Sequence, residues 1–509
     1  MATLIGPLLP AFKIPFDNSF ARELPGFYVA QRPAVVRAPR LLHFNPTLAN
    51  ELGLDLTSLD DQARADLFAG NIVPEGAEPI AQAYAGHQFG GFSPRLGDGR
   101  ALLLGEVIDR QGHRRDIAFK GSGRTPYARG GDGKAAVGPM LREVLVSEAI
   151  HALGIPTTRA LAVAATGEQV IRESALPGAV LTRVAASHIR VGTFEFYARR
   201  GDVASVRKLA DYTIARHDPA LSATPQPYIG LLRHVVARQA ALIAQWMNVG
   251  FIHGVMNTDN MTISGETIDY GPCAFMEDYD PAAVFSSIDH GGRYAFGNQP
   301  EIAAWNLARL AEALLPLLSD DHERAVEMAT EVIAGFLPLY GGQLLRGQRI
   351  KLGLSQADVE DDSADSALID DWLALLYAER VDFTLAWRRL ADAAEGNEAL
   401  LRGLFANASA PDAWLVRWHA RVADEVQNGA STGGADRARQ MRGASPIVIA
   451  RNHRVEEALA AASEYGDLAP FERLLAALMQ PYDETAEAAR YAEPAPAAVT
   501  EKYQTFCGT

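Results

Sequence analysis

The chain has 509 residues, 48% of them apolar, which is the composition of an ordinary globular protein long enough for about three domains. It carries 47 Lys and Arg against 62 Asp and Glu, a net charge of −15, so we expect neither nucleic acid nor an anionic membrane surface as a partner. Its two cysteines, Cys273 and Cys507, are too few for a disulfide framework or a four-thiolate zinc site, and they suit a reducing compartment.

The amino-terminal residues predict no targeting segment. Residues 1–16 contain three prolines and lack a basic region. No run of about eighteen uninterrupted apolar residues predicts a membrane-spanning helix. We therefore expect a soluble, cytoplasmic protein with no membrane partner, and the sequence leaves its oligomeric state open.

The first part of the chain predicts short segments of secondary structure, and strands are predicted after them. Residues 1–75 predict an amino-terminal extension of short segments. In the next region, residues 76–192, the stretches 101–108 and 114–121 flank a turn and predict a hairpin. Residues 139–154 predict a helix, with a proline near the start and a glycine past the end. Three further strands are expected at 159–166, 168–173 and 178–185.

A helical pattern replaces the strands from residue 193 onward. Residues 202–217 and 228–250 predict two helices, the second long and strongly apolar. Helices continue to about residue 480, with a polar break at 427–443. We therefore expect a helical lobe over residues 193–430, followed by carboxyl-terminal helices and a cysteine-bearing tail over residues 431–509.

Several familiar catalytic motifs are absent from the sequence. It contains neither a G-x-x-x-x-G-K-[ST] phosphate loop nor an H-E-x-x-H zinc motif. One G-x-S-x-G pattern occurs at residues 429–433, but a nucleophile elbow needs an apolar strand directly before it and a helix directly after. This copy lies in a polar linker, so we interpret it as a loop.

A lysine and a glutamate in the strand-rich region suit phosphate binding. Lys120 closes the strand at 114–121, and Glu143 lies on the following helix. A lysine held on a strand can neutralise polyphosphate charge if a carboxylate keeps its ammonium oriented. Taken alone, the pair is equally compatible with a surface lysine and a solvated helix face.

Two glycine-rich loops lie on either side of Lys120 in the sequence. Gly97, Gly99 and Arg100 precede a strand, and Asp132 and Gly133 belong to a second glycine-rich patch. Glycines let backbone N–H groups approach phosphate, and an arginine adds a fork of donors. Either loop alone is also compatible with a plain turn.

Residues 250–272 predict a loop, a tight hairpin around Ser264 and Gly265, and a second loop. The hairpin would bring Asp259 and Asn260 to the same edge as Asp269. An amide and a carboxylate so placed are hard oxygen ligands for Mg²⁺, whose other positions go to phosphate and water.

This arrangement is similar to the metal site of protein kinases, with one departure. Protein kinases use H-R-D-x-x-x-x-N on one loop and D-F-G on the next. His253 and Asn260 keep the first and last residues of the former, and Asp269 begins the counterpart of D-F-G. Val255 stands where the kinase has its catalytic aspartate, and a valine accepts no proton. The nearest carboxylate is Asp259, so the chain is either inactive or uses a different base.

These motifs together resemble the selenoprotein O family. The resemblance is carried by long and chemically unusual segments and reaches nearly the whole chain, at residues 84–107, 120–135, 154–161, 178–196, 253–275 and 451–459. It implies an α+β, bilobal protein-kinase-like fold, with a strand-rich N-lobe, a larger helical C-lobe and extensions at both ends. It also implies transfer of AMP from ATP, bound in a flipped orientation, to Ser, Thr or Tyr hydroxyls of protein substrates.

The resemblance also assigns roles to individual residues. Lys120 matches the phosphate-binding lysine and Glu143 its ion-pair partner, while Asp259 matches the proton acceptor. Asn260 and Asp269 match the ligands of Mg²⁺ or Mn²⁺. The nucleotide-contacting positions are Gly97, Gly99, Arg100, Asp132, Gly133, Arg183 and Arg190. A flipped nucleotide makes the β- and γ-phosphates the leaving group, and these cations would stabilise it.

Members of the family carry a Cys or selenocysteine near the carboxyl terminus, and this chain has Cys507 there. In similar bacterial proteins, a cysteine at the position of Cys273 can pair with the terminal one. We therefore hypothesise a redox-sensitive Cys273–Cys507 bond, against the alternative of two unpaired thiols.

Three other functions are compatible with parts of the pattern. The same fold could transfer UMP from UTP, because base selectivity depends on the shape of the pocket. An ordinary protein kinase is disfavoured by Val255 and by the lack of G-x-G-x-x-G. A non-catalytic nucleotide-binding scaffold has no need of the metal pair, Asn260 and Asp269.

Overall fold

The amino-terminal residues build both edges of a large sheet. The computed structural model describes residues 13–354, 363–427, 433–500 and 502–506. Strand β1 (Tyr28–Ala30) pairs with β3 (Ile80–Gln82), and β2 (Arg40–Phe44) pairs with β9 (Arg159–Ile171). Three short helices accompany them, namely α1 (Ser19–Glu23), α2 (Pro46–Glu51) and α3 (Asp61–Ala69).

The sheet has eight strands, and seven of them follow one antiparallel path. The path runs β1-β3-β6-β7-β10-β9-β2, and β8 (Ala135–Ala136) pairs with β10 beside it. Strands β6 (Ala101–Ile108) and β7 (Arg114–Lys120) form the predicted hairpin, and β10 (Ala175–Ala185) includes the strand expected at 178–185. With the helices described below, this sheet confirms the predicted α+β class.

The strands expected at 159–166 and 168–173 are confirmed as strand, but they form one continuous strand, β9, which ends at Ile171. Gly167 adopts a φ of +69° in the middle of this strand. Glycine reaches that region without steric cost. The pairing of β9 with β10 shifts register close by, so the chain makes a bulge here and then continues the strand.

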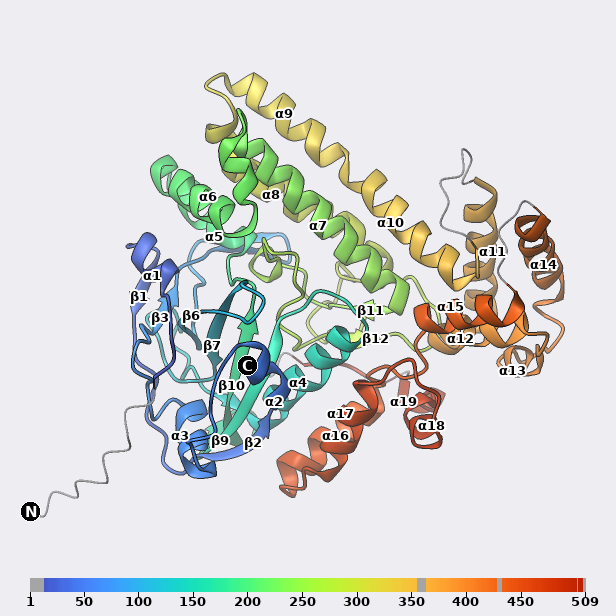
Figure 1. Cartoon of the computed structure of the whole chain (residues 1–509), viewed down its shortest axis with the longest axis horizontal. Coiled ribbons are helices and arrows are strands. Elements are labelled where there is room, and N and C mark those ends of the chain that lie inside the picture. Colours follow the sequence, from blue (N-terminus) through green and yellow to red (C-terminus); the bar gives the residue numbers. More distant parts are fainter. Residues whose placement is uncertain (1–12, 355–362, 428–432, 501, 507–509) are drawn as a thin grey trace, which may run out of the picture.

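Helix α4 (Val137–Ala152) crosses the sheet and is buried along nearly its whole length. It contacts β9 and β10, and it also contacts two late helices, α16 (Asn452–Glu464) and α17 (Ala469–Leu478) (Figure 1). The buried residues of α4 include the charged Arg142, Glu143 and Glu148 as well as its apolar side chains. The predicted helix at 139–154 is confirmed, shifted by two residues.

The segment that connects β3 to β6 folds into a small separate hairpin. Its strands are β4 (Gly86–Gln88) and β5 (Gly91–Ser93). This hairpin contacts α5 (Val191–Ala198), the first helix after the sheet. It therefore lies where the sheet meets the helical part of the molecule.

The middle of the chain forms a layer of long helices (Figure 1). The helices predicted at 202–217 and 228–250 are confirmed as α6 (Val203–His217) and α7 (Pro227–Val249), and Gly250 ends α7 with a φ of +73°. Beside α7 pack α8 (Gln299–Leu318), α9 (His322–Ala334) and α10 (Phe336–Lys351). The 3₁₀ helix η1 (Pro219–Ala223) joins α6 to α7, and a second one, η3 (Phe296–Asn298), leads into α8.

The predicted hairpin around Ser264 and Gly265 is wrong, although a turn is present there. Strands β11 (Phe251–Ile252) and β12 (Ala274–Phe275) close the two ends of the segment, and η2 (Thr258–Asn260) lies between them. Thr262 pairs with Arg190, and Thr267 pairs with Thr157, rather than with each other. The buried backbone of this segment finds its hydrogen bonds in neighbouring elements, which a local pattern does not reveal.

The carboxyl-terminal region is helical, including part of the predicted polar break. Helix α15 (Gly434–Ala444) overlaps residues 427–443, and it forms because Ala438 and Met441 are buried in a hydrophobic cluster. No helix in the described residues is long and apolar enough to span a bilayer. The other helices are α11 (Ser363–Glu379), α12 (Phe383–Ala394), α13 (Ala399–Arg402), α14 (Asp412–Gln427), α18 (Ala486–Ala492) and α19 (Ala497–Thr500).

Candidate active site

Lys120 lies at the centre of a buried charge cluster. It is the last residue of β7, and its Nζ lies 2.6 Å from Glu143 Oε1 and 2.7 Å from Asp269 Oδ1. Glu143 reaches it from α4, and the same Glu143 oxygen accepts a hydrogen bond from the backbone N–H of Tyr270. The structure therefore brings together three residues that the sequence singles out, from a strand, a helix and a loop.

Three cationic side chains, those of Lys120, Arg183 and Arg190, lie around the carboxylate of Asp269. Arg183 Nη1 lies 2.7 Å from its Oδ1, and Arg190 Nη1 lies 3.8 Å from its Oδ2. Burial by itself raises the pKa of Asp269, but the charges of Lys120, Arg183 and Arg190 outweigh burial and hold this pKa well below its usual range. The carboxylate is therefore ionised, as a metal ligand must be.

The backbone of Asp269 is strained as well. Its φ is +64°, in the left-handed region that residues other than glycine avoid. Such a conformation costs about 1–3 kcal/mol and persists only where the surroundings enforce it. The ion pairs with Lys120 and Arg183 and the neighbouring bond from Tyr270 to Glu143 provide that enforcement.

Asp259 differs from Asp269 in its protonation. Burial raises the pKa of Asp259 to about 6, in spite of the opposing charge of Arg190. Its Oδ2 accepts one hydrogen bond, from Gln88 Nε2 at 3.2 Å, and its Oδ1 is buried without a hydrogen-bond partner among the described residues. A carboxylate with a free oxygen and a pKa near neutrality can accept a proton. The charged or titratable groups facing it are Arg190, Asp269, Tyr84 and Tyr294.

Asn260 sits next to Asp259 at the end of η2. Its Nδ2 donates a hydrogen bond of 3.0 Å to the carbonyl of Val255, which leaves the amide oxygen for a ligand. The side chain of Val255 belongs to the hydrophobic core, so it takes no part in chemistry. The valine that replaces the kinase aspartate therefore has a packing role, and its carbonyl orients Asn260.

The oxygens of Asn260 and Asp269 suit a hard divalent cation, although they would not enclose it. No group of three or more His, Cys, Asp or Glu that could hold a metal ion occurs in the described part of the chain. A cation bound by one amide and one carboxylate completes its coordination with water and phosphate oxygens, as Mg²⁺ usually does in nucleotide sites. The residues present therefore fit such a metal when the nucleotide is bound.

Gly97 and Gly99 have a reason to be glycine that the sequence does not indicate. A Cβ on Gly97 would lie 2.4 Å from the ring of Tyr127, and one on Gly99 would lie 3.0 Å from the carbonyl oxygen of Tyr127. These glycines thus allow the loop around Tyr127 to pack on them. The carbonyl of Arg100 accepts a hydrogen bond of 2.7 Å from the N–H of Gly121, which places Arg100 beside the end of β7.

Asp132 and Gly133 lie on a loop that packs against the chain directly after Lys120. The carbonyl of Gly133 accepts a hydrogen bond of 3.1 Å from the N–H of Gly123. Asp132 is exposed, and its carboxylate lies 3.0 Å from Arg172, so it is not part of the buried cluster. The structure therefore brings Gly133 close to the end of β7 and leaves Asp132 at the surface.

Replacing Gly133 with Ala should destabilise the protein by at least about 3 kcal/mol, because an added Cβ would lie 2.2 Å from the carbonyl oxygen of Gly123 at a φ of +69°. Gly130→Ala is the matched control, since Gly130 has a φ of +90° with no atom within 4 Å of the added Cβ. That control should lose only about 1–2 kcal/mol. Thermal or urea unfolding of both variants measures the difference, and equal losses would contradict the packing argument.

Several residues of the site were missed by the sequence analysis. The guanidinium of Arg190 lies 4.5 Å from the ring centre of Tyr84, and its Nη1 donates to the carbonyl of Asp259 at 3.0 Å. Gln88 orients Asp259, as described above. Tyr84 and Gln88 lie in the unusual segment 84–107, and that unusual composition was the available signal, but no known motif assigns them a role.

Arg142, the neighbour of Glu143 on α4, ties this helix to the loop after Asp269. Its Nε lies 3.3 Å from the carbonyl oxygen of Tyr270 and 3.0 Å from that of Gly271. Its Nη1 lies 3.2 Å from Glu456 on α16. One buried arginine therefore joins α4, the loop after Asp269 and a carboxyl-terminal helix.

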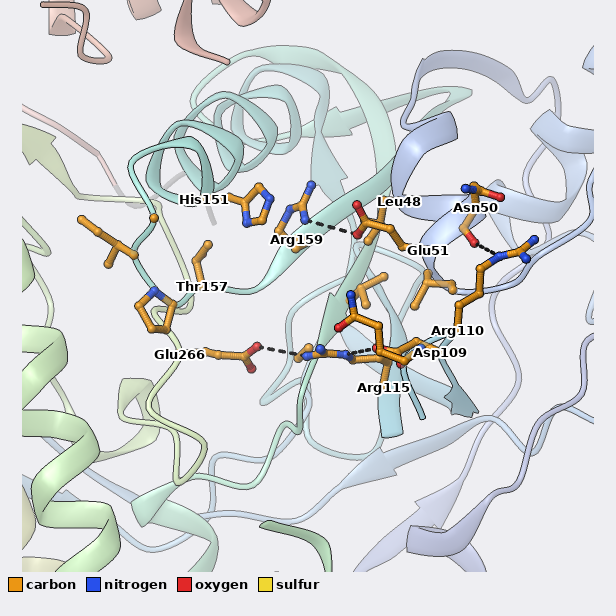
Figure 2. A pocket seen from close by; sticks show the side chains of 17 residues that line it. Leu48, Asn50, Glu51, Asp109, Arg110, Arg115, His151, Thr157, Arg159 and Glu266 are labelled. Carbon is orange, nitrogen blue, oxygen red and sulfur yellow. Dashed lines mark hydrogen bonds and ion pairs between the residues drawn. The ribbon is translucent and has the colours of Figure 1, made fainter. Parts of the chain in front are cut away.

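A cavity of about 630 Å³ lies away from this cluster (Figure 2). It is bounded by α2, the turn between β6 and β7, and the end of α4, and none of Lys120, Asp259 and Asp269 lines it. Figure 2 shows Glu266 and Arg115 facing each other in its wall, with their nearest charged atoms 4.0 Å apart. Burial raises the pKa of Glu266 to about 7, and its Oε2 accepts a hydrogen bond of 2.8 Å from the N–H of Ala186.

Glu266→Gln should stabilise the protein at pH 8 and leave its stability nearly unchanged at pH 5. The folded pKa of about 7 exceeds the ordinary value of 4.5, so the folded state holds this proton more tightly and loses stability as the pH rises through that window. At pH 8 the ionised group costs about 3 kcal/mol, which an uncharged amide avoids. Thermal unfolding at both pH values is the measurement, and a lower midpoint at pH 8 would refute the assignment.

A lysine–glutamate pair, two buried arginines and oxygen ligands on one loop define an enzyme that acts on a nucleoside triphosphate. The family model described as protein adenylyltransferase SelO matches residues 10–479. The chain belongs to this family and is a nucleotidyltransferase.

Close relatives cover almost the full chain. A protein nucleotidyltransferase YdiU of Cereibacter sphaeroides is 60% identical over 495 residues, which are 97% of this chain and 99% of that protein. The protein of the same description from Chromobacterium violaceum is 60% identical over 487 residues, 96% of this chain and 100% of its own. That of Methylorubrum extorquens is 56% identical over 503 residues, with coverage of 97% and 99%.

Proposed function

We propose that this enzyme transfers AMP from ATP to Ser, Thr or Tyr hydroxyls of protein substrates, with ATP bound in a flipped orientation and with Mg²⁺ or Mn²⁺ as the metal. The observation that carries this proposal is the convergence of Lys120, Arg183 and Arg190 on Asp269, with Asp259 beside them. The cations can stabilise a polyphosphate leaving group, and the second carboxylate can serve as the base.

Each proposed role follows from the surroundings of its residue. Lys120, held by Glu143, and the arginines Arg183 and Arg190 would bind the β- and γ-phosphates, together with Arg100. Asn260 and Asp269 would hold the metal, which supplies Lewis-acid stabilisation of phosphate charge when it is bound. Asp259 would accept the proton of the attacking hydroxyl. The backbone around Gly97, Gly99, Asp132 and Gly133 would contact the nucleotide.

The proposed fold is bilobal and protein-kinase-like. Its support is a strand-rich region whose lysine pairs with a glutamate on α4, followed by a larger helical region that carries the metal-binding loop. The boundaries we propose are residues 76–192 for the N-lobe and 193–430 for the C-lobe. Residues 1–75 and 431–509 would then be the extensions.

ATP labelled separately at the α- and γ-phosphorus tests the proposed function. We expect label on protein from the α position alone, in the presence of Mg²⁺ or Mn²⁺. Label from the γ position alone would make the enzyme a kinase, and bound ATP without transfer would indicate a scaffold. Parallel reactions with α-labelled UTP compare UMP transfer with AMP transfer.

We also propose that Cys273 and Cys507 form a redox-sensitive bond. Cys273 is buried and has no disulfide partner among the described residues, which do not include Cys507. Burial raises the pKa of the Cys273 thiol to about 11. The support is Thr505, two residues before Cys507, whose hydroxyl donates a hydrogen bond of 2.7 Å to the carbonyl of Pro272. Peptide maps with and without reductant, after mild oxidation, should show one shared peptide, and its absence would refute the bond.

A further inference from the structure

We propose that Glu195 is a positioning residue that fixes the loop of Asp259 through the hydroxyl of Thr258. The proposal rests on the proposed function in one respect, namely that Asp259 is the proton acceptor. Glu195 lies on α5, and its two carboxylate oxygens bond to residues of two different elements. Oε2 accepts the hydrogen bond of Thr258 Oγ1, and Oε1 bonds to His87 Nδ1.

Thr258 closes a ring of contacts with these two partners. Its hydroxyl oxygen accepts a hydrogen bond of 2.7 Å from the backbone N–H of His87, while its proton goes to Glu195. Both the donor and the acceptor direction of the hydroxyl are therefore fixed. Thr258 begins η2 and directly precedes Asp259, so the position of the hydroxyl sets the position of the aspartate backbone.

The small hairpin of β4 and β5 holds the residues on both sides of Thr258 as well. Asn257 Oδ1 accepts from the N–H of Phe89 at 3.2 Å, and Gln88 Nε2 donates to Asp259 Oδ2 at 3.2 Å. Consecutive residues from 87 to 89 thus bond to consecutive residues from 257 to 259. Glu195 joins this contact to α5, which contacts both the hairpin and η2.

Glu195 and its two hydrogen-bond partners are all buried. Its exposed fraction is 3%, that of His87 is 6%, and that of Thr258 is 0%. A carboxyl group buried to this degree is costly unless its hydrogen bonds are satisfied. Among the described residues its salt-bridge partner is His87 rather than a Lys or Arg, and its two bonds hold His87 and Thr258 in a defined geometry.

The geometry matters because Asp259 has few other restraints. One of its side-chain oxygens has a single hydrogen bond and the other has none among the residues that the structure describes. A displacement of about 1 Å at a reacting group can lower a rate about 10²-fold. Releasing Thr258 should therefore affect the rate of transfer much more than the binding of ATP, whose proposed contacts lie on Lys120, Arg183 and Arg190.

Glu195→Gln in the full-length enzyme is the first test, because the amide cannot reproduce both acceptor bonds. We expect kcat for AMP transfer to fall about 10- to 100-fold while KM for ATP changes less than about twofold.

Thr258→Val and Thr258→Ser form the matched pair. Valine keeps the shape and removes the hydroxyl, so it should reproduce the loss in kcat, whereas serine keeps the hydroxyl and should restore most of the activity. The pair also tests the proposal if Glu195→Gln does not fold. Wild-type kcat in Thr258→Val, or equal losses in the serine and valine variants, would overturn the proposal.

The test separates this inference from the proposed function. If the wild-type enzyme transfers no α-label, the proposed function fails before any variant is measured, and this inference fails with it. If the wild type transfers AMP and Asp259→Asn is inactive, but Glu195→Gln has the wild-type rate, only the positioning role is overturned. A joint fall in kcat, ATP affinity and thermal midpoint would assign Glu195 to general stability instead.

Discussion

Asp269→Asn should lower AMP transfer by about 10³-fold or more. The amide removes the carboxylate that would bind the metal, and it removes the charge on which Lys120 and Arg183 converge. Without that charge the two cations also lose their alignment for phosphate. The measurement is incorporation of α-labelled AMP at saturating ATP and metal.

The same substitution should lower the free energy of unfolding by about 3 kcal/mol, because it breaks buried ion pairs. The loss is limited because Lys120 keeps its contact with Glu143. Asp436→Asn is the control, since Asp436 is exposed and pairs with Arg439 on the surface of α15. Circular dichroism should show unchanged secondary structure in both variants, and activity retained by Asp269→Asn would refute the metal assignment.

The rate of AMP transfer should fall below about pH 6 because Asp259 becomes protonated there. The pKa of its buried carboxyl is raised to about 6, so the group is ionised above this pH and able to accept a proton. Below it, the rate should fall about tenfold per pH unit. Asp259→Asn should lower kcat by about 10²- to 10⁴-fold and remove the acid limb of the profile.

Asp98 is the matched control for this assignment. Burial also raises its pKa to about 6, and its Oδ2 accepts a hydrogen bond of 2.9 Å from the N–H of Gln82. If Asp259 is the base, Asp98→Asn should keep an acid limb at the same pH, whatever its effect on stability. If the acid limb instead disappears in Asp98→Asn and persists in Asp259→Asn, the titrating group is Asp98 and not Asp259.

Local patterns in the sequence predicted the elements that carry their own signals. The hairpin of β6 and β7 has alternating strands around a turn, and α4 and α7 have helix-breaking residues at their ends. The residue types and spacing of Lys120, Glu143 and Asp269 resemble a known nucleotide site. In the structure, one carboxylate oxygen of Glu143 and one of Asp269 lie within 2.7 Å of Lys120 Nζ.

The remaining features depend on contacts between distant segments. No hairpin forms around Gly265, because Thr262 pairs with Arg190 and Thr267 pairs with Thr157. Both partners lie far away in the sequence. The reason for glycine at Gly97 is the ring of Tyr127. The link between Glu195 and Thr258 spans 63 residues. Such tertiary contacts leave no periodic trace, so a single sequence does not reveal them.

The enclosure of α4 has a consequence for how the enzyme can be controlled. In protein kinases, activity is switched by moving the helix that carries the glutamate partner of the lysine. Here that helix is held between the sheet and α16 and α17, and Arg142 fastens it to the loop of Asp269. A swing of α4 would have to detach the carboxyl-terminal helices first. We therefore expect the lysine–glutamate pair to stay assembled without an activating signal.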